Sequence, residues 1–131
     1  MMNVDLIKIL AVGSGGFIGA VFRYLISVFA ISQAPDSKFP YGTVAVNLIG
    51  CLLIGFLAGL FELKSWGNPE FRLFIFVGIL GGFTTFSTFS HETFLLFENG
   101  KLLMSLVNLG VQVVFGLAFV WVGYQIVRLF S

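Results

Sequence analysis

Charged residues are scarce in this sequence, and cysteine is almost missing. Of 131 residues 10% are charged and 58% are apolar, whereas a soluble domain typically has about 25% charged residues. This balance indicates a membrane protein, and a net charge of +1 argues against nucleic acid as a partner. Cys51 is the single cysteine, which excludes a disulfide framework or a thiolate metal site within one chain.

Residue patterns for catalysis are missing as well. His91-Glu92 begins like the zinc motif H-E-x-x-H, but Leu95 stands where the second histidine belongs. No Ser-His-Asp set, phosphate-binding loop or pair of catalytic carboxylates is apparent. We therefore expect that the protein is not an enzyme.

Long apolar segments are plentiful, and four of them reach the length of about 20 residues that crosses a bilayer. They predict an all-α membrane protein with one four-span domain over residues 1–131 and both termini on one side. The prolines lie in the connections Ser32–Pro40 and Glu62–Glu70, and Glu98–Lys101 predicts a tight turn. The predicted spans are Leu6–Ile31, Tyr41–Phe61, Phe71–Phe97 and Leu102–Phe130.

The positive charges give only a weak orientation bias. The side of the termini has Lys8, Lys64, Arg72 and Arg128, and the opposite side has Lys38 and Lys101. The counts fit either one fixed orientation or insertion both ways round. Glycines recur in the first two spans and permit close helix approach. Because four helices are few to enclose an ion path, a homodimer is the minimal solution, and insertion both ways would make it antiparallel.

The third predicted span contains a double glycine followed by a cluster of hydroxyls. Gly81-Gly82 disfavours a continuous helix by roughly 1 kcal/mol per residue. Five of the seven residues Thr84–Ser90 are serine or threonine. Irregular backbone and clustered polar groups occur at membrane depth only where protein or a wet cavity surrounds them. We predict that this helix is broken mid-span and that Gly81–Ser90 is the functional centre.

Other polar side chains lie within the first two spans. Arg23 is either an anion-attracting charge at the mouth of a pathway or an arginine whose head reaches the interface. Asn47 needs hydrogen-bond partners near mid-span, so it either lines a path or joins two helices. Thr43 lies four residues earlier on the same helical face, which favours a polar stripe.

The last two spans also contain polar groups. Asn108 and Gln112 repeat the four-residue spacing, with Ser105 nearby. Their amides either offer N–H groups to an anion or form interhelical hydrogen bonds. Glu92 follows the hydroxyl cluster by one turn, and it is either a gate or an interfacial carboxylate.

Phe86 and Phe89 alternate with hydroxyls beside the predicted break. With 17 phenylalanines in the chain, packing in a core is the simpler interpretation of any pair. Their place next to the break instead indicates that part of each ring faces a polar interior. Phenyl edges have partial positive charge, so they would attract a small anion without holding it tightly.

Three motifs give the sequence a family resemblance over its whole length. They are Gly15–Arg23; Gly42-Thr43 with Val46–Gly50; and Gly81–Ser90 followed by Glu92. With these motifs and four spans, the chain resembles the Fluc (CrcB) family of fluoride ion channels. The fourth span departs from the family pattern, because Gln112 stands near a family histidine and Phe115-Gly116 near a family serine.

The resemblance implies an antiparallel, dual-topology homodimer with two fluoride pores in the cell (inner) membrane. It also implies a structural sodium ion that is not transported, held by the backbone carbonyls of Gly81 and Thr84 from both subunits. Unwound helices expose carbonyls that suit such a cation. By motif position, the fluoride pathway contains Phe86, Phe89, Ser87, Thr88 and Asn47, with Thr43, Arg23 and Glu92 toward the vestibule; Asn108 and Gln112 are further candidates.

The expected function is passive fluoride export that relieves fluoride toxicity. One rival is a proton-coupled small multidrug-type exporter, which depends on a glutamate deep in its first span. Here that span has Arg23 and no acid beyond Asp5, which favours anions. A second rival is a non-transporting membrane subunit that packs against a larger partner.

Overall fold

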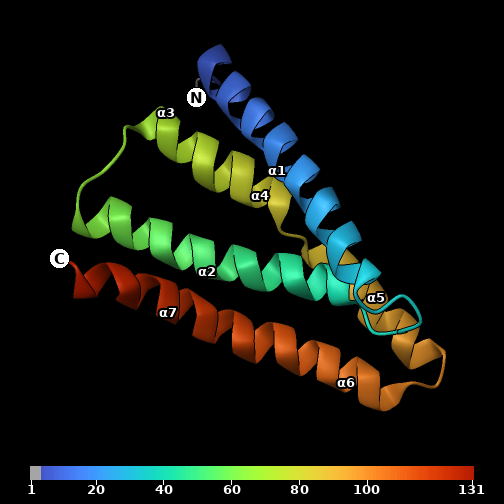
Figure 1. Ribbon diagram of the computed structural model, residues 1–131. Helices are drawn as coiled ribbons and strands as arrows, with labels where there is room; N and C mark the ends of the chain where they lie inside the picture. The colour runs from blue at the N-terminus through green and yellow to red at the C-terminus, as the bar shows by residue number, and fades with distance from the viewer. Residues whose placement is uncertain (1–3) are drawn as a thin grey trace.

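The computed structural model describes residues 4–131, which form four long helices and no strand. This confirms the prediction of an all-α chain with four helices long and apolar enough to span a membrane (Figure 1). The first two are α1 (Leu6–Ser32) and α2 (Tyr41–Leu63). The third span is α3 (Pro69–Arg72), π-helical η1 (Leu73–Leu80), α4 (Gly81–Phe83) and α5 (Phe86–Glu98); the fourth is α6 (Leu102–Gly110), π-helical η2 (Val111–Phe115) and α7 (Gly116–Leu129).

Side-chain caps set the start of three helices. The Asp5 carboxylate accepts a hydrogen bond from the Ile7 amide at the start of α1. Asn68 caps α3 in the same way, with Pro69 at the first helical position. The Thr85 hydroxyl accepts from the Thr88 amide and starts α5. Each cap satisfies an amide that the first turn of a helix leaves without a partner.

Glycines let the spans approach closely in two pairs. In Figure 1, α2 lies along α7, and α1 lies along η1 and α4. A Cβ atom at Gly55 would collide with the carbonyl of Val120 on α7, and one at Gly19 with the carbonyl of Ile79 on η1. Backbone therefore packs against backbone, as the recurring glycines of the first two spans predict.

The double glycine of the third span is helical, contrary to the prediction that it interrupts the helix. Gly81 has φ −63° and ψ −39°, and a Cβ atom at Gly82 would lie 2.6 Å from the carbonyl oxygen of Gly16. The lack of a side chain at Gly82 therefore allows the third span to pack closely against α1. The residues with extended backbone are Thr84 (φ −84°, ψ 158°) and Thr85 (φ −149°, ψ 118°). We call these two residues the extended segment.

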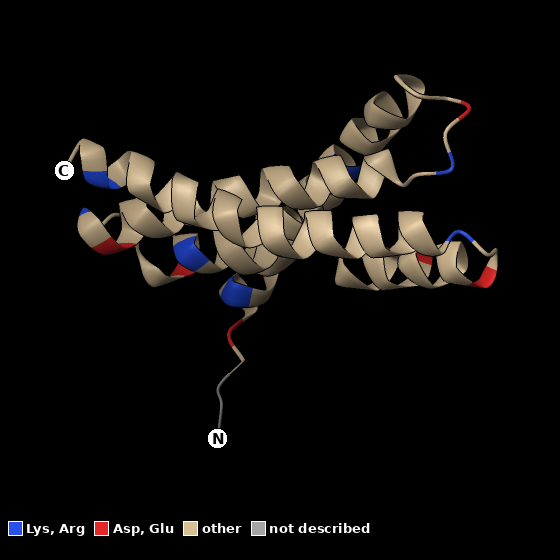
Figure 2. Cartoon of the chain, turned by 90° about the horizontal axis from the view of Figure 1, so that it is seen from below, with Lys and Arg blue, Asp and Glu red and all other residues tan. Residues whose placement is uncertain are grey.

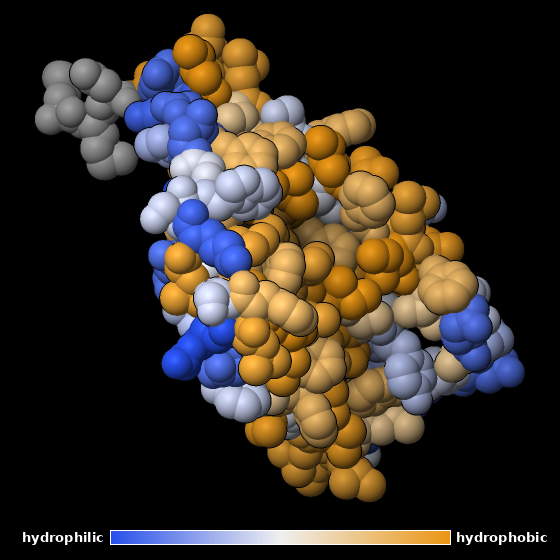
Figure 3. Space-filling view, turned by 60° about the vertical axis from the view of Figure 1, so that its left-hand side comes forward, coloured by the Kyte–Doolittle hydropathy of each residue, from blue (hydrophilic) through white to orange (hydrophobic). Residues whose placement is uncertain are grey.

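The surface of the helices is strongly apolar. Large hydrophobic side chains are exposed along the spans, for example Phe17 at 73% and Leu103 at 77%. Figure 2 shows most charged residues on loops and helix ends. In Figure 3, hydrophobic residues cover most of one face, and hydrophilic residues gather toward its margins. This distribution matches helices surrounded by lipid.

Candidate functional site

The side chain of Asn47, on α2, binds both backbone groups of Thr85. Its Oδ1 accepts from the Thr85 amide at 2.9 Å, and its Nδ2 donates to the Thr85 carbonyl at 3.0 Å. Unpaired backbone groups cost several kcal/mol each in a hydrocarbon environment. One carboxamide thus replaces the helical hydrogen bonds that the extended segment lacks, which explains why this irregular backbone is tolerated here.

Asn47 also begins a chain of hydrogen bonds that crosses to the fourth span and returns to the third. Its Nδ2 donates to Gln112 Oε1 at 2.7 Å, and Gln112 Nε2 donates to Asn108 Oδ1 at 2.8 Å. Asn108 Nδ2 donates to Thr93 Oγ1 at 2.8 Å, and that hydroxyl donates to the Phe89 carbonyl at 2.7 Å. We call this chain, from Thr85 through Asn47, Gln112, Asn108 and Thr93 to Phe89, the amide relay.

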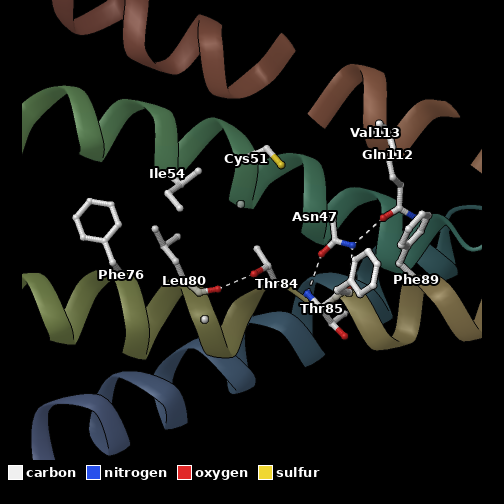
Figure 4. Close-up of a pocket in the computed structure, with 13 residues that line it drawn as sticks. Asn47, Cys51, Ile54, Phe76, Leu80, Thr84, Thr85, Phe89, Gln112 and Val113 are labelled. Carbon is white, nitrogen blue, oxygen red and sulfur yellow. Dashed lines mark hydrogen bonds between the residues drawn. The ribbon is translucent and has the colours of Figure 1, made fainter. Parts of the chain in front are cut away.

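A cavity of about 440 Å³ lies beside the extended segment (Figure 4). Asn47 and Gln112 border it on one side, and none of its 13 lining residues is charged. The cavity therefore combines polar amide groups with apolar walls. The lining residues are Asn47, Gly50, Cys51, Ile54, Phe76, Leu80, Gly81, Thr84, Thr85, Phe86, Phe89, Gln112 and Val113.

Phe86 and Phe89 both border this cavity and contact each other. Their ring centroids are 5.7 Å apart with an interplanar angle of 57°. Phe89 is 6% exposed, whereas Phe86 is 79% exposed. The phenylalanine pair of the third motif is therefore brought to the cavity that Asn47 and Gln112 border, with one ring packed inside the chain and the other on its surface.

The remaining hydroxyls of the motif lie at the start of α5. Thr85 Oγ1 donates to Thr88 Oγ1 at 3.0 Å, and the Ser87 hydroxyl lies 3.5 Å from Thr85 Oγ1. Ser87 and Thr88 are exposed and do not border the 440 Å³ cavity. Their hydroxyls are grouped around Thr85 on the outer side of the same turn.

Thr43 and Glu92 meet at the other end of the α2–α5 contact. The Thr43 hydroxyl donates to Glu92 Oε1 at 2.9 Å, whereas Glu92 Oε2 is buried with no hydrogen-bond partner among residues 4–131. Both residues and Thr88 border a second cavity of about 350 Å³. The polar stripe expected from Thr43 and Asn47 thus faces the third span at both positions, α5 at Thr43 and the extended segment at Asn47.

Two backbone carbonyls at the extended segment are left without a helical partner. In a continuous helix the Gly81 carbonyl would accept from Thr85, but that amide donates to Asn47. The Thr84 carbonyl would accept from Thr88, but that amide donates to the Thr85 hydroxyl. Within the described part of the chain, no hydrogen bond ends on either carbonyl. Carbonyl oxygens of this kind suit a hard cation.

Arg23 is half-buried on α1 and does not border either cavity. Thr93 is a further member of the site that the sequence motifs do not indicate: its hydroxyl accepts from Asn108, and its carbonyl accepts from the Ser105 hydroxyl at 2.8 Å. The predicted turn at Glu98–Lys101 indicates the position of Thr93 opposite the fourth span. Thr93 and Ser105 are nearly equidistant from that turn, so antiparallel helices place them opposite each other.

Fold and site together define a multi-pass membrane protein with an uncharged cavity between its spans. The family model described as "CrcB-like protein, Camphor Resistance (CrcB)" matches residues 10–124. The chain belongs to this family.

Similar proteins from several bacteria bear one name, "Fluoride-specific ion channel FluC". The protein from Elusimicrobium minutum is 46% identical over 118 residues, which is 90% of this chain and 91% of the relative. The one from Shewanella oneidensis is 47% identical over 120 residues, 92% of this chain and 95% of the relative. The one from Methylobacillus flagellatus is 37% identical over 122 residues, with 93% and 95% covered. These are names of channels and not of enzymes, in agreement with the lack of catalytic patterns.

Proposed function

We propose that the protein is a fluoride-selective channel that lets fluoride leave the cell passively across the inner membrane. The observation that carries this proposal is the uncharged cavity at the extended segment, bordered by the amides of Asn47 and Gln112 and by two phenyl rings, in a chain whose relatives are named fluoride channels. Fluoride enters from acidic surroundings as neutral HF and dissociates inside. An inside-negative potential then drives the anion out with about 2.3 kcal/mol per charge per 100 mV, which relieves fluoride toxicity.

The chemistry of the cavity suits a small anion that must give up its water. Amide N–H groups and hydroxyls replace hydration, and the positive edges of Phe86 and Phe89 attract the ion weakly. Because the lining contains no charged residue, no fixed cation binds the ion so tightly that its exit becomes slow.

The functional unit is an antiparallel, dual-topology homodimer with two pores. The support is the exposure of site residues within one chain. Phe86 is 79% exposed beside the cavity, and Gly81 and Ser87 are exposed as well. A second copy seated against α4 and α5 would cover this part of the site and complete the walls of each pathway.

A sodium ion at the dimer centre holds the two subunits in register. The carbonyls of Gly81 and Thr84 supply its oxygen ligands, two from each chain, and both lack a hydrogen-bond partner in residues 4–131. Bound there, the cation compensates the exposed carbonyl dipoles. It is a structural ion and is not transported.

The other polar residues of the third motif and its neighbours form the approaches to the pore. Ser87 and Thr88 line it beyond the phenyl rings, and Thr43, Arg23 and Glu92 belong to the vestibule. The shared cavity of Thr43, Thr88 and Glu92 supports the grouping of these three residues. Asn108 and Gln112 form its side in the fourth span.

Flux from liposomes that contain only the purified protein tests this function. We expect fluoride efflux under a potassium-diffusion potential and no chloride efflux. Proton-driven export of a cationic drug without fluoride flux would instead establish the multidrug-type alternative. The residues of α1 give that alternative little support, because the acid Asp5 caps the end of the helix and does not lie deep within the span. Absence of any flux would favour a non-transporting subunit.

A further inference from the structure

A further cavity, of about 570 Å³, lies at the start of the third span. It extends from the loop that precedes α3 along the first turns of η1, and none of its lining residues belongs to the proposed fluoride pathway. Only Phe76 also borders the cavity at the extended segment. We call this second site the Arg72 cavity; its lining residues are Gly67, Pro69, Arg72, Leu73, Phe76 and Val77.

The guanidinium of Arg72 is held in a defined position at this cavity. Its Nη2 donates to the Phe61 carbonyl at 2.9 Å, and its Cζ lies 5.0 Å from the centroid of the Phe61 ring. That ring is buried and contacts the Phe76 ring at a centroid distance of 5.2 Å. A Cβ atom at Gly67 would collide with the same ring. The guanidinium therefore lies on a ring that two residues of the cavity wall contact.

The charge of Arg72 is not compensated at this cavity. No acidic residue borders it, and the bond to Phe61 is the one hydrogen bond that the guanidinium forms within residues 4–131. A guanidinium has five N–H donors in a planar fork, so the others are free for a further acceptor. Because Arg72 is exposed, such an acceptor can reach it from outside the chain.

The Arg72 cavity is polar at the end of the span and apolar farther along it. Its arginine lies in the first turn of the membrane-spanning segment Pro69–Glu98, and Phe76 and Val77 follow toward the middle of the span. Trp66, which is 48% exposed, immediately precedes the first residue of the cavity, and tryptophan is typical of the membrane–water interface. A phospholipid has the same order, with its phosphate at the interface and its acyl chains below.

We propose that the Arg72 cavity binds an anionic phospholipid, with the headgroup phosphate on the Arg72 guanidinium and an acyl chain along Phe76 and Val77. The phosphate accepts two hydrogen bonds from the guanidinium fork and neutralises its charge, as in other basic pockets among membrane-spanning helices. A headgroup with an ammonium fits less well, because no acid borders the cavity to receive that positive charge. This lipid contact goes beyond the proposed channel function and does not depend on fluoride conduction.

Native mass spectrometry of the purified protein tests the role of Arg72. The protein in detergent is titrated with phosphatidylglycerol and, in parallel, with phosphatidylethanolamine, which we expect to bind more weakly. We expect Arg72→Gln to raise the apparent Kd for phosphatidylglycerol about tenfold, because a charged hydrogen-bond pair is lost. The matched control Arg128→Gln removes an exposed cation in the last turn of α7 that does not border the cavity. An unchanged Kd in Arg72→Gln, or an equal increase in both variants, overturns the proposal.

Fluorescence of Trp66 decides the matter even where Arg72→Gln does not fold. The chain has two tryptophans, so Trp121→Phe leaves Trp66 as the reporter beside an intact cavity. In vesicles with a minor fraction of brominated lipid, we expect phosphatidylglycerol to quench Trp66 more strongly than phosphatidylethanolamine does. The converse variant, Trp66→Phe, leaves Trp121, 64% exposed on α7, which both lipids should quench equally. Equal quenching of Trp66 by the two lipids overturns the proposal.

A second copy of the chain seated over the Arg72 cavity is the competing occupant. It would shield Trp66 from both lipids, and Arg72→Gln would then weaken self-association without changing lipid binding, a result that overturns the lipid contact. Wild-type protein that conducts no fluoride removes the proposed channel function alone, because lipid adducts and Trp66 quenching are measured without fluoride.

Discussion

The hydroxyl of Thr43 is the one hydrogen-bond donor to the Glu92 carboxylate among residues 4–131, at 2.9 Å from Oε1. The second oxygen, Oε2, is buried with no partner. A half-satisfied buried carboxylate is costly, because it has given up water without full replacement. The Thr43 hydroxyl therefore contributes more to the contact between α2 and α5 than an ordinary surface hydrogen bond does.

The substitution Thr43→Val tests this dependence. Valine has the shape of threonine without the donor, so we expect the free energy of unfolding to fall by about 1–3 kcal/mol, measured by denaturant titration in detergent. In a Glu92→Gln background the loss should be smaller. The control Ser14→Ala removes a hydroxyl that bonds only within its own helix on an exposed face, and an equal loss there would contradict the prediction.

Close packing of α2 on α7 predicts strong sensitivity at Gly55. Because a Cβ atom there would collide with the Val120 carbonyl, we expect Gly55→Ala to lower the free energy of unfolding by about 1–3 kcal/mol. Gly13 is the matched control, since a Cβ atom there would meet nothing within 4 Å. Gly13→Ala should be neutral or should stabilise the helix by up to about 1 kcal/mol. Equal behaviour of the two variants would refute the packing argument.

Replacement of either ring of the cavity pair tests the anion contact. We expect Phe86→Ile and Phe89→Ile each to abolish fluoride flux from liposomes, because isoleucine fills space but has no ring edge with partial positive charge. Size-exclusion chromatography should show the proposed dimer unchanged. Phe97, exposed near the end of α5, provides the control Phe97→Ile with normal flux. Wild-type flux in both cavity variants would disprove the role of the ring edges.

Removal of sodium tests the proposed structural ion. In the proposed dimer, removal of the cation would leave the partly negative carbonyl oxygens of Gly81 and Thr84 from both subunits close together, where they would repel. We expect fluoride flux to fall at least tenfold when N-methylglucamine replaces sodium on both sides, and to return when sodium is restored. Flux independent of sodium would argue against an ion at these carbonyls. The effect should persist in Gln112→Met, since that side chain lies outside the carbonyl pair.

Much of the fold followed from the sequence, because bilayer thickness alone dictates the length of apolar segments. The predicted span Tyr41–Phe61 and the observed helix Tyr41–Leu63 begin at the same residue. The exact place of the extended segment did not follow. Helix propensity pointed to Gly81-Gly82, but those glycines are needed against α1, and Thr85 caps the next helix instead.

The residues of the candidate site were easier to predict than the hydrogen bonds that join them. The four-residue spacing of Asn108 and Gln112 indicated one polar face. Nothing in that spacing showed that Asn47 would meet Gln112 across two spans at 2.7 Å, because such a contact depends on how α2 and the fourth span pack. The direction of the relay depends in turn on the backbone at Thr85, which only the folded chain supplies.

The π-helical segment η2 changes the direction in which side chains face along the fourth span. Its wider turns contain an additional residue, so the parts before and after it do not follow one α-helical periodicity. Asn108 faces α5, whereas Gly123 faces the backbone of α2 near Leu52. Deleting one residue within Val111–Phe115 would rotate α7 by about 100° relative to α6. This short segment therefore lets one span pack against two differently oriented neighbours, α5 before η2 and α2 after it.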